Sequence, residues 1–256
     1  MKSVGFIGTG NITSALVEGL CTAGEPPKSI LVSPRNAAKA AKLAAGFSQV
    51  RVAEDNQAVI DGSAIVFLAL LPEIAPDVLP QLHFRKDQKI VSLIAVTPID
   101  LIKTLIGDLD HVVRAVPLPT VAQHEGPVIL YPDDPEIGDI FKSIGTLVVV
   151  SSEKEVGVLA SVTALISPFF ALMGAISDWA ATGGIEECVA RQFTASMFHA
   201  LAAQAMAMDK SDFSEFAVEA ATPGGLNEQA SAIINVKGGF SAFLDALNAV
   251  AARSSD

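Results

Sequence analysis

The stretch Val4-Gly5-Phe6-Ile7-Gly8-Thr9-Gly10-Asn11-Ile12, near the N-terminus, decides the fold. Its first four residues predict a short buried strand, and the apolar spacing that begins at Ile12 predicts an amphipathic helix from Asn11 onward. A glycine turn between a strand and a helix is typical of pyrophosphate sites, because the helix N-terminus offers unpaired N–H groups. Gly8 would permit the tight turn, and Gly10 would let the backbone approach a phosphate.

This turn predicts dinucleotide binding, with one departure from the usual fingerprint. A third glycine normally follows the second by three residues, and Thr13 stands at that position. Two glycines alone are a weak signal, but here they lie at the first strand–helix junction, where the fingerprint belongs. The candidate cofactor residues in the turn are Gly8, Thr9, Gly10, Asn11 and Ile12.

The composition indicates a folded protein with a well-filled core. The chain has 256 residues, of which 50% are hydrophobic and 18% charged, which is enough for one large or two medium domains. The formal net charge of −11 argues against nucleic acid or an anionic membrane surface as a partner. An anionic ligand would therefore have to be held by local donors, because the overall field repels it.

The cysteines and histidines indicate neither a disulfide framework nor a metal site. Cys21 and Cys188 are isolated thiols, as expected in a reducing cytoplasm, and the four histidines are too irregularly spaced to bind metal together. Because the N-terminal residues show no basic region and no cleavage site, we expect no signal peptide. We therefore predict a cytoplasmic protein without a metal.

Residues 156–177 carry no charge and are long enough to cross a bilayer. A membrane span is disfavoured because Lys and Arg do not cluster at its ends, Asp178 follows directly, and Pro168 interrupts it. The alternative is a helix buried on all sides, either inside a helical domain or at a subunit interface. We predict this alternative.

Strand and helix patterns alternate through the first half of the chain. Expected strands cover residues 4–7, 29–33, 49–53, 65–70, 89–94 and 112–116, with further strands at 128–131 and 147–150. Expected helices cover residues 36–45, 56–61, 73–79, 98–106 and 135–143, besides the one after the glycine turn. Repeated strand–helix units with short connections predict an α/β fold, a Rossmann-type doubly wound parallel sheet with helices on both faces.

Beyond residue 152 the strand patterns stop and Ala-rich helical periodicity continues to the end. We predict two domains: residues 1–152 form the NADP-binding Rossmann domain, and residues 153–256 form an all-helical substrate and dimerisation domain.

The end of the second expected strand indicates which dinucleotide is bound. NAD-specific sites place a carboxylate there to bind the ribose 2′-hydroxyl, whereas residues 33–36 are Ser-Pro-Arg-Asn. Ser33, Arg35 and Asn36 are neutral or cationic donors, and Arg35 is able to bind a phosphate through two hydrogen bonds. The sequence therefore predicts NADPH.

Several motifs, in this order, resemble the pyrroline-5-carboxylate reductase family. They are residues 5–11, residues 33–36, Asp55-Asn56, Ala69-Leu70-Leu71-Pro72, residues 113–117 (Val-Arg-Ala-Val-Pro) and Thr222-Pro223-Gly224-Gly225. The resemblance implies an NADPH-dependent reductase of a cyclic imine that produces proline, with a helical second domain that interleaves with a partner subunit. It adds Asn56, Ala69, Leu70 and Pro72 to the candidate cofactor residues and implies a homodimer or higher homo-oligomer.

The turn at Thr222-Pro223-Gly224-Gly225 is the candidate substrate site. A helix that begins after Gly225 would offer free N–H groups to a substrate carboxylate, so Gly224, Gly225 and Leu226 are candidate substrate residues. The resemblance implies a hydroxyl near the imine nitrogen at position 227, and this chain has Asn227 there. We therefore expect Asn227 and Thr222 to be the catalytic hydrogen-bonding residues. The alternative is an ordinary helix N-terminus with proline in its first turn.

The chain departs from the family pattern near the substrate. Leu71 replaces a lysine, Leu118 replaces an asparagine, and bulky residues at 165–169 replace a small-residue segment. Two other functions therefore stay open. One is an oxidoreductase of the β-hydroxyacid dehydrogenase type, although no lysine in the early second domain suits that reaction. The other is a non-catalytic NADP-binding protein.

Overall fold

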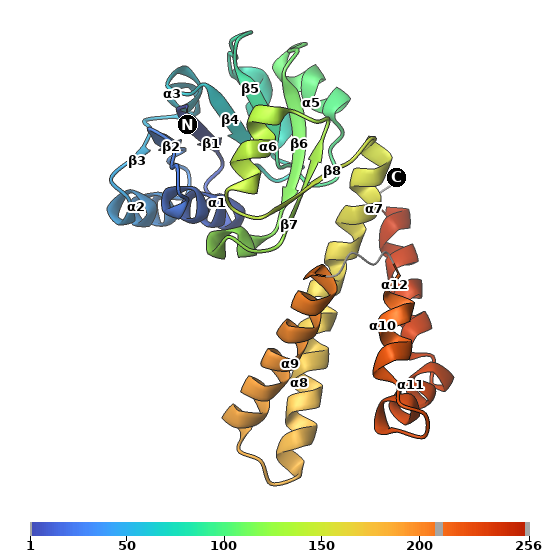
Figure 1. The fold of residues 1–256 in the computed structure, drawn as a ribbon. Helices are drawn as coiled ribbons and strands as arrows, with labels where there is room; N and C mark the ends of the chain where they lie inside the picture. Colours follow the sequence, from blue (N-terminus) through green and yellow to red (C-terminus); the bar gives the residue numbers. More distant parts are fainter. Residues whose placement is uncertain (1, 208–211, 254–256) are drawn as a thin grey trace. The chain divides into compact units, whose positions relative to one another are not determined.

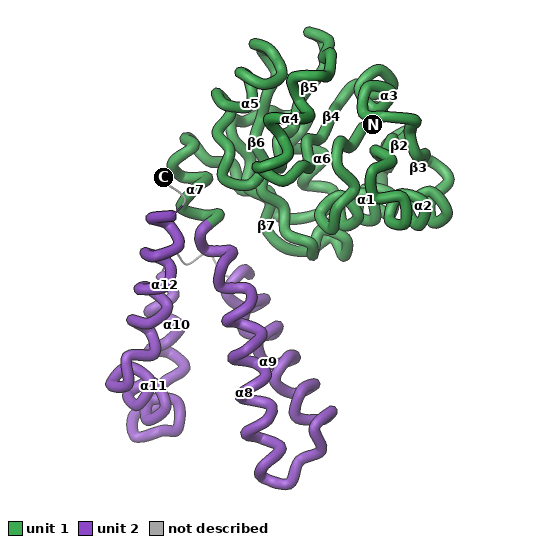
Figure 2. Tube along the Cα trace, turned by 180° about the vertical axis from the view of Figure 1, so that it is seen from behind, with its two compact units in different colours: residues 1–160 green, residues 161–256 purple. Residues whose placement is uncertain are grey.

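The computed structural model describes residues 2–207 and 212–253. The chain divides into two compact units, residues 1–160 and 161–256, shown in green and purple in Figure 2. Helix α7 (Glu153–Val162) follows the last strand and ends just past the division. The functional boundary expected at residues 152–153 is tested by neither observation and stays a prediction.

The first unit is built on an eight-stranded sheet with the order β3-β2-β1-β4-β5-β6-β7-β8. Strands β1 to β6 are parallel, β7 is antiparallel to β6, and β8 is parallel to β7. The strands are β1 (Val4–Ile7), β2 (Ile30–Val32), β3 (Val50–Val52), β4 (Ile65–Leu68), β5 (Lys89–Ser92), β6 (Val112–Pro117), β7 (Pro127–Tyr131) and β8 (Thr146–Val149). The order of β1 to β6 is that of a Rossmann fold, which confirms the predicted class.

Helices cover both faces of this sheet, as Figure 1 shows. The helical segments are α1 (Asn11–Thr22), α2 (Ala37–Gly46), α3 (Asn56–Asp61), α4 (Ala75–Val78), η1 (Leu79–Gln81), α5 (Ile99–Ile106), η2 (Pro119–Gln123) and α6 (Pro135–Lys142). One hydrophobic cluster joins the sheet to α1, α2, η2 and α6, and a second joins it to α3, α4, η1 and α5.

The strands are apolar on both faces because both faces are covered. Phe6 and Phe67, on neighbouring strands, stack with ring centroids 4.8 Å apart, and Phe141 of α6 meets Phe67 edge-on at 6.1 Å. Ile7 and Leu68 follow in sequence and belong to the cluster on the opposite face. Successive side chains of a strand point to opposite faces, so a continuous apolar run supplies both clusters.

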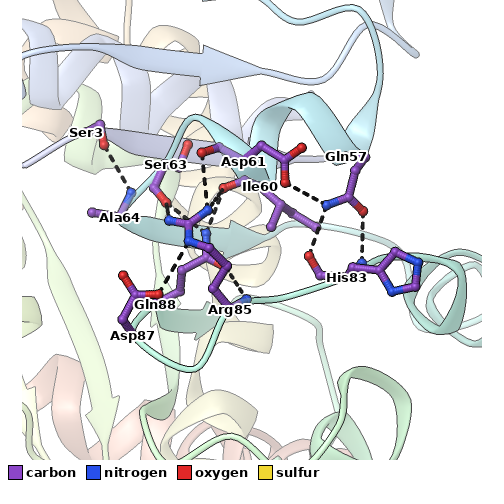
Figure 3. Close-up of polar contacts among 10 residues, drawn as sticks. All are labelled: Ser3, Gln57, Ile60, Asp61, Ser63, Ala64, His83, Arg85, Asp87 and Gln88. Carbon is purple, nitrogen blue, oxygen red and sulfur yellow. Dashed lines mark hydrogen bonds and ion pairs between the residues drawn. The ribbon is translucent and has the colours of Figure 1, made fainter.

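A polar network closes the C-terminal end of α3, at the sheet edge where β4 and β5 begin (Figure 3). The Arg85 guanidinium donates hydrogen bonds to the carbonyls of Ile60, Asp61 and Ser63 at 3.0–3.2 Å. The buried Gln88 amide donates to the carbonyls of Ile60 and Ser63 at 2.7 and 2.8 Å. The last carbonyls of a helix have no hydrogen-bond donors within the helix. The side chains of Arg85 and Gln88 supply the missing donors at the end of α3.

In its described residues the second unit consists of helical segments joined by turns and short connections. They are η3 (Thr163–Leu165), α8 (Ile166–Thr182), α9 (Glu187–Ala207), α10 (Phe213–Ala220), α11 (Leu226–Val236) and α12 (Gly239–Arg253). Helices α8 and α9 pack on each other, with Phe169 and Phe198 meeting edge-on at 5.6 Å. Helix α12 packs on α11 and on η3.

The charge-free segment is helical but is not buried inside the chain. Residues Glu153–Thr182 form a helical run, broken by η3, that is long and apolar enough to cross a membrane. Only 11% of its most apolar window is buried, and Phe170 and Trp179 are 65% and 76% exposed. The expectation that its own domain would bury this helix is therefore wrong, and burial at a subunit interface is the part of the prediction that stays open.

Candidate cofactor and substrate sites

The candidate cofactor residues of the first unit gather at one edge of the sheet. They follow the carboxyl ends of the adjacent parallel strands β2, β1 and β4, and Asn56 begins α3, which follows β3. The connections from β1 and β4 leave toward opposite faces of the sheet, so the strand order reverses between them. Ligands of open α/β sheets bind outside the carboxyl ends of the strands at such a reversal.

Gly8 is required by the fold itself. Its φ of +98° lies in the left-handed region, and a Cβ added there would lie 2.3 Å from the carbonyl oxygen of Ala69. Ala69 also donates its backbone N–H to the carbonyl of Ile7 at 2.8 Å, so the turn after β1 lies directly against the end of β4. Gly8 therefore lets two strand ends meet at the candidate site.

Hydroxyl groups hold the turn in place. The Gly8 N–H donates to the Ser33 hydroxyl at 2.9 Å, and the Thr9 hydroxyl donates to the Ser33 carbonyl at 2.7 Å. Thr13, in place of the third glycine, donates its hydroxyl to the Gly8 carbonyl at 2.6 Å. Ser33 is buried. Its hydroxyl therefore holds the glycine turn, and the expected contact of Ser33 with the cofactor stays a prediction.

Gly10, unlike Gly8, is not required by the fold. Its surroundings are instead suited to binding a dinucleotide. Its backbone is extended, with φ −93° and ψ −165°, a conformation open to any residue, and a Cβ added there would meet nothing within 4 Å. Gly10 is also the N-cap of α1 and places no side chain over the first N–H groups of that helix. Open space beside free helix N–H groups suits a pyrophosphate.

The side chains after β2 differ in how many hydrogen bonds they make within the chain. Asn36 is the N-cap of α2, and its side-chain oxygen accepts the Lys39 N–H at 3.4 Å, a long hydrogen bond. Arg35 is exposed, and its side chain makes no hydrogen bond or ion pair with the described residues. The Lys39 ammonium donates to the Asn11 side-chain oxygen in the first turn of α1. Lys39 was absent from the sequence-based candidates, although its place in the first turn of the helix expected at residues 36–45 was visible.

The remaining cofactor candidates lie after β3 and β4. Asn56 is the first residue of α3, whose N-cap Asp55 accepts the Ala58 N–H at 2.8 Å. The Leu70 side chain lies beside Gly8, and Pro72 follows the 62% exposed Leu71. At this exposed position the chain therefore has an apolar side chain, where the resembled family has lysine.

The candidate substrate turn belongs to the second unit. Gly225 is the N-cap of α11, so Leu226 and Asn227 lie in its first turn, as predicted. The Asn227 amide donates to the carbonyl of Ala220, the last residue of α10, at 2.9 Å. The Glu228 carboxylate accepts the Gly224 N–H at 2.6 Å.

These contacts alter the expected chemistry of the turn. One N–H group expected to bind a substrate carboxylate already binds a carboxylate of the chain, and the Asn227 amide already has an acceptor. Sequence reasoning missed Glu228, although a Glu at the third position of a helix is a familiar N-terminal signal. Thr222 is exposed, and its carbonyl accepts the Gly225 N–H at 2.8 Å. The roles of Thr222, Gly224, Gly225, Leu226 and Asn227 stay predictions.

The described residues contain no cluster suited to a metal ion, and the Cys21 thiol is not activated. No group of three or more His, Cys, Asp or Glu side chains lies close enough together there to hold a metal ion. Burial raises the pKa of the Cys21 thiol to about 11, which keeps it protonated and unreactive at neutral pH.

Comparisons with known proteins cover both halves of the chain. Residues 3–96 match the family described as NADP oxidoreductase coenzyme F420-dependent, and residues 156–256 match the family described as pyrroline-5-carboxylate reductase dimerisation. The pyrroline-5-carboxylate reductase of Pseudomonas aeruginosa is 27% identical over 99% of this chain and 96% of its own length.

Solved structures show the same fold. A pyrroline-5-carboxylate reductase from Coxiella burnetii superposes with a TM-score of 0.85 at 24% identity, covering 98% of this chain and 97% of its own. The Plasmodium falciparum pyrroline carboxylate reductase, solved with NADP bound, gives a TM-score of 0.84 at 16% identity, covering 98% and 96%. These matches run from one end of the chain to the other and confirm the resemblance to the pyrroline-5-carboxylate reductase family.

Proposed function

We propose that the protein is an NADPH-dependent reductase of a cyclic imine, with pyrroline-5-carboxylate as the expected substrate and proline as the product. The observation that carries the proposal is the glycine turn, which leaves Gly10 and the N-terminus of α1 open in a chain that resembles this family. The absence of a carboxylate in residues 33–36 and the exposed Arg35 support NADPH over NADH.

The cofactor, when bound, supplies the hydride that reduces the carbon–nitrogen double bond. The residues of the chain bind the cofactor and the substrate and orient them toward each other. The first N–H groups of α1 neutralise a pyrophosphate, and Arg35 pairs with a 2′-phosphate. A protonated imine is already electrophilic, so the substrate residues need only hold the ring in position and hydrogen-bond its polar groups. We assign that role to Thr222, Asn227 and the backbone N–H of Leu226. Gly224 and Gly225 shape the turn around them, since their N–H groups bind Glu228 and the Thr222 carbonyl.

We propose further that the active protein is a homodimer joined through its helical unit. The isolated chain exposes Trp179, Phe193, Met206 and Val218 by 70% or more, and such an apolar surface marks an interaction site in a soluble protein. A second copy is favoured over a membrane because the family matched by residues 156–256 is described by its dimerisation. The free thiols of Cys21 and Cys188 agree with a cytoplasmic protein.

The test is an assay of the full-length protein. NADPH oxidation is followed with pyrroline-5-carboxylate and with other cyclic imines, and NADP⁺ reduction is followed with 3-hydroxy acids. Turnover of a cyclic imine supports the proposal. Turnover of hydroxy acids alone points to a dehydrogenase of C–OH bonds, and NADPH binding without any turnover points to a non-catalytic protein. Light scattering on the same sample checks the dimer, which a stable monomer at micromolar concentration would exclude.

A further inference from the structure

Lys39 lies where two cofactor-binding segments come together. It is the third residue of α2, three positions after the N-cap Asn36. Its ammonium donates to the side-chain oxygen of Asn11, the first residue of α1. Helices α1 and α2 lie side by side on the same face of the sheet (Figure 1). The lysine therefore bridges the segment after β2 and the glycine turn after β1.

The positive charge of Lys39 is not cancelled by an acidic partner. Its acceptor is a neutral amide, and among the residues that the structure describes no carboxylate lies within ion-pair distance of Nζ. Lysines elsewhere in the same unit do have such partners, for example Lys89 with Asp134 at 2.6 Å. An ammonium held by an amide keeps its full attraction for an incoming anion, whereas one held by a carboxylate loses most of it.

The position of the Lys39 charge indicates which anionic group of a dinucleotide it would bind. In a fold of this strand order, the adenosine ribose lies between the glycine turn and the end of the second strand. Arg35 lies three residues after the end of β2, and Lys39 is four residues further on, in the first turn of α2. Both cations therefore flank the place of the ribose 2′ position.

We propose that Lys39 is a second cationic ligand of the NADPH 2′-phosphate, acting together with Arg35, and that Asn11 holds the ammonium ready for it. The proposal rests on the proposed use of NADPH. An ammonium has three donors, so two stay available after the bond to Asn11. A phosphate has enough acceptor oxygens to bind the fork of Arg35 and the ammonium at once.

The fold also provides a matched control. Lys42 is on the same helix three residues later, is exposed, and borders the same hollow of about 310 Å³ between α1, α2 and η2 as Lys39. Removing either lysine changes the net charge equally. Only Lys39 touches the glycine-turn segment, so a general charge effect and a local contact are separable.

The experiment measures dissociation constants of NADPH and NADH for the full-length wild type, Lys39→Gln and Lys42→Gln, with melting temperatures as a folding check. Lys39→Gln should weaken NADPH binding about tenfold, the usual loss for one charge-assisted hydrogen bond, and leave NADH binding unchanged. Lys42→Gln should leave both affinities unchanged. Adenosine 2′,5′-bisphosphate should lose affinity with Lys39→Gln in the same proportion as NADPH, because it keeps the 2′-phosphate without the nicotinamide half.

Three results would overturn the inference. Equal weakening of NADPH and NADH by Lys39→Gln would place the lysine at the pyrophosphate. Unchanged NADPH affinity in Lys39→Gln, with a wild type that still prefers NADPH, would reject Lys39 while leaving the proposed cofactor intact. A wild type without preference for NADPH would reject the cofactor and the role of Lys39 together.

Discussion

The Gly8 amide and the Ser33 hydroxyl are joined by a hydrogen bond of 2.9 Å, which connects the turn after β1 to the end of β2. Both residues were expected to contact the cofactor directly. The bond shows that the Ser33 hydroxyl holds the turn, and a direct contact of Ser33 with the cofactor stays a prediction.

Replacing Ser33 by Ala should therefore affect both cofactors. The Gly8 N–H loses its partner, which costs about 1–2 kcal/mol of unfolding free energy and loosens the turn. NADPH and NADH should weaken by similar factors in titrations, and the melting temperature should fall. The contrasting variant is Arg35→Gln, which should weaken NADPH alone without changing the melting temperature. If Ser33→Ala weakened the binding of NADPH but not of NADH, the result would instead indicate that Ser33 contacts the 2′-phosphate.

The two glycines of the turn should respond differently to the same change. Gly8→Ala forces a side chain into the left-handed region and against the Ala69 carbonyl, so it should lower the melting temperature sharply. Gly10→Ala meets no atom of the chain and should fold normally, but its methyl group would occupy the ligand's space. Thermal melts and NADPH titrations of both variants make the comparison. Wild-type NADPH affinity in a folded Gly10→Ala protein would refute the assignment of the site.

The network around Arg85 yields a prediction on stability alone. Gln88→Leu keeps the bulk of the buried side chain but removes the acceptor of the Arg85 backbone N–H and one of the two donors to the carbonyls of Ile60 and Ser63. Arg85 still binds both carbonyls, so the main loss comes from its unsatisfied backbone N–H, which costs about 1–3 kcal/mol. Asp87→Asn is the control, because its ion pair with Arg85 is 3.4 Å long and Asp87 is 79% exposed. Urea denaturation should show a clear loss for the first variant and almost none for the second.

The ion pair between Lys89 and Asp134 makes stability depend on pH at both extremes. Burial raises the pKa of Asp134, but the hydrogen bonds from Lys89 and the Ile137 N–H outweigh it and hold the pKa below its usual value. The hydrogen bond from Lys2 lowers the pKa of Glu136, and Lys89 lowers it further. Burial lowers the pKa of Lys89, but Asp134 and Glu136 outweigh it and raise the pKa above the usual value.

The sign of each effect follows from these directions. The lowered pKa values of Asp134 and Glu136 stabilise the fold above their unfolded-state pKa values, and this stability is lost as pH falls through the folded ones. The raised pKa of Lys89 stabilises the fold below its unfolded-state value, and that part is lost as pH rises through the folded one. Asp134→Asn keeps the N-cap of α6 and removes the charge, so it should flatten the acid side of a plot of melting temperature against pH. An unchanged acid slope in this variant would contradict the assignment.

Much of the first unit was predictable because its signals are local. The continuous apolar strands, the glycine turn and the α3 bounds at Asn56–Asp61 agree with the expectations. The helix expected at residues 73–79 begins at Ala75 instead and continues as η1, because Pro76 and Pro80 lack N–H groups and are tolerated only in the first turn of a helix.

What the sequence did not reveal depends on contacts between distant segments. The Ser33 hydroxyl turns inward because the Gly8 N–H, 25 residues away, needs an acceptor. The contact of Lys39 with Asn11 likewise depends on how α1 and α2 pack, which no local pattern encodes. The exposure of residues 153–182 could not be foreseen either, because periodicity does not distinguish burial within one chain from burial between two chains.

Asn227 is the residue on which the substrate prediction depends most. Its amide donates to the Ala220 carbonyl at 2.9 Å, so it fastens α11 to the end of α10, while its oxygen stays available to a substrate. Asn227→Ala should lower the melting temperature because that carbonyl loses its donor, and it should lower kcat/KM about tenfold if the side chain also contacts the substrate in the transition state.

Asn227→Thr separates the two roles. A threonine is too short to reach the Ala220 carbonyl in the same way, but it restores the hydroxyl that the family pattern places near the imine nitrogen. We expect this variant to be less stable than the wild type and more active on pyrroline-5-carboxylate. The measurements are kcat/KM and melting temperature on both variants. If both variants lost stability but kept the wild-type kcat/KM, the role of Asn227 would be limited to joining α10 and α11.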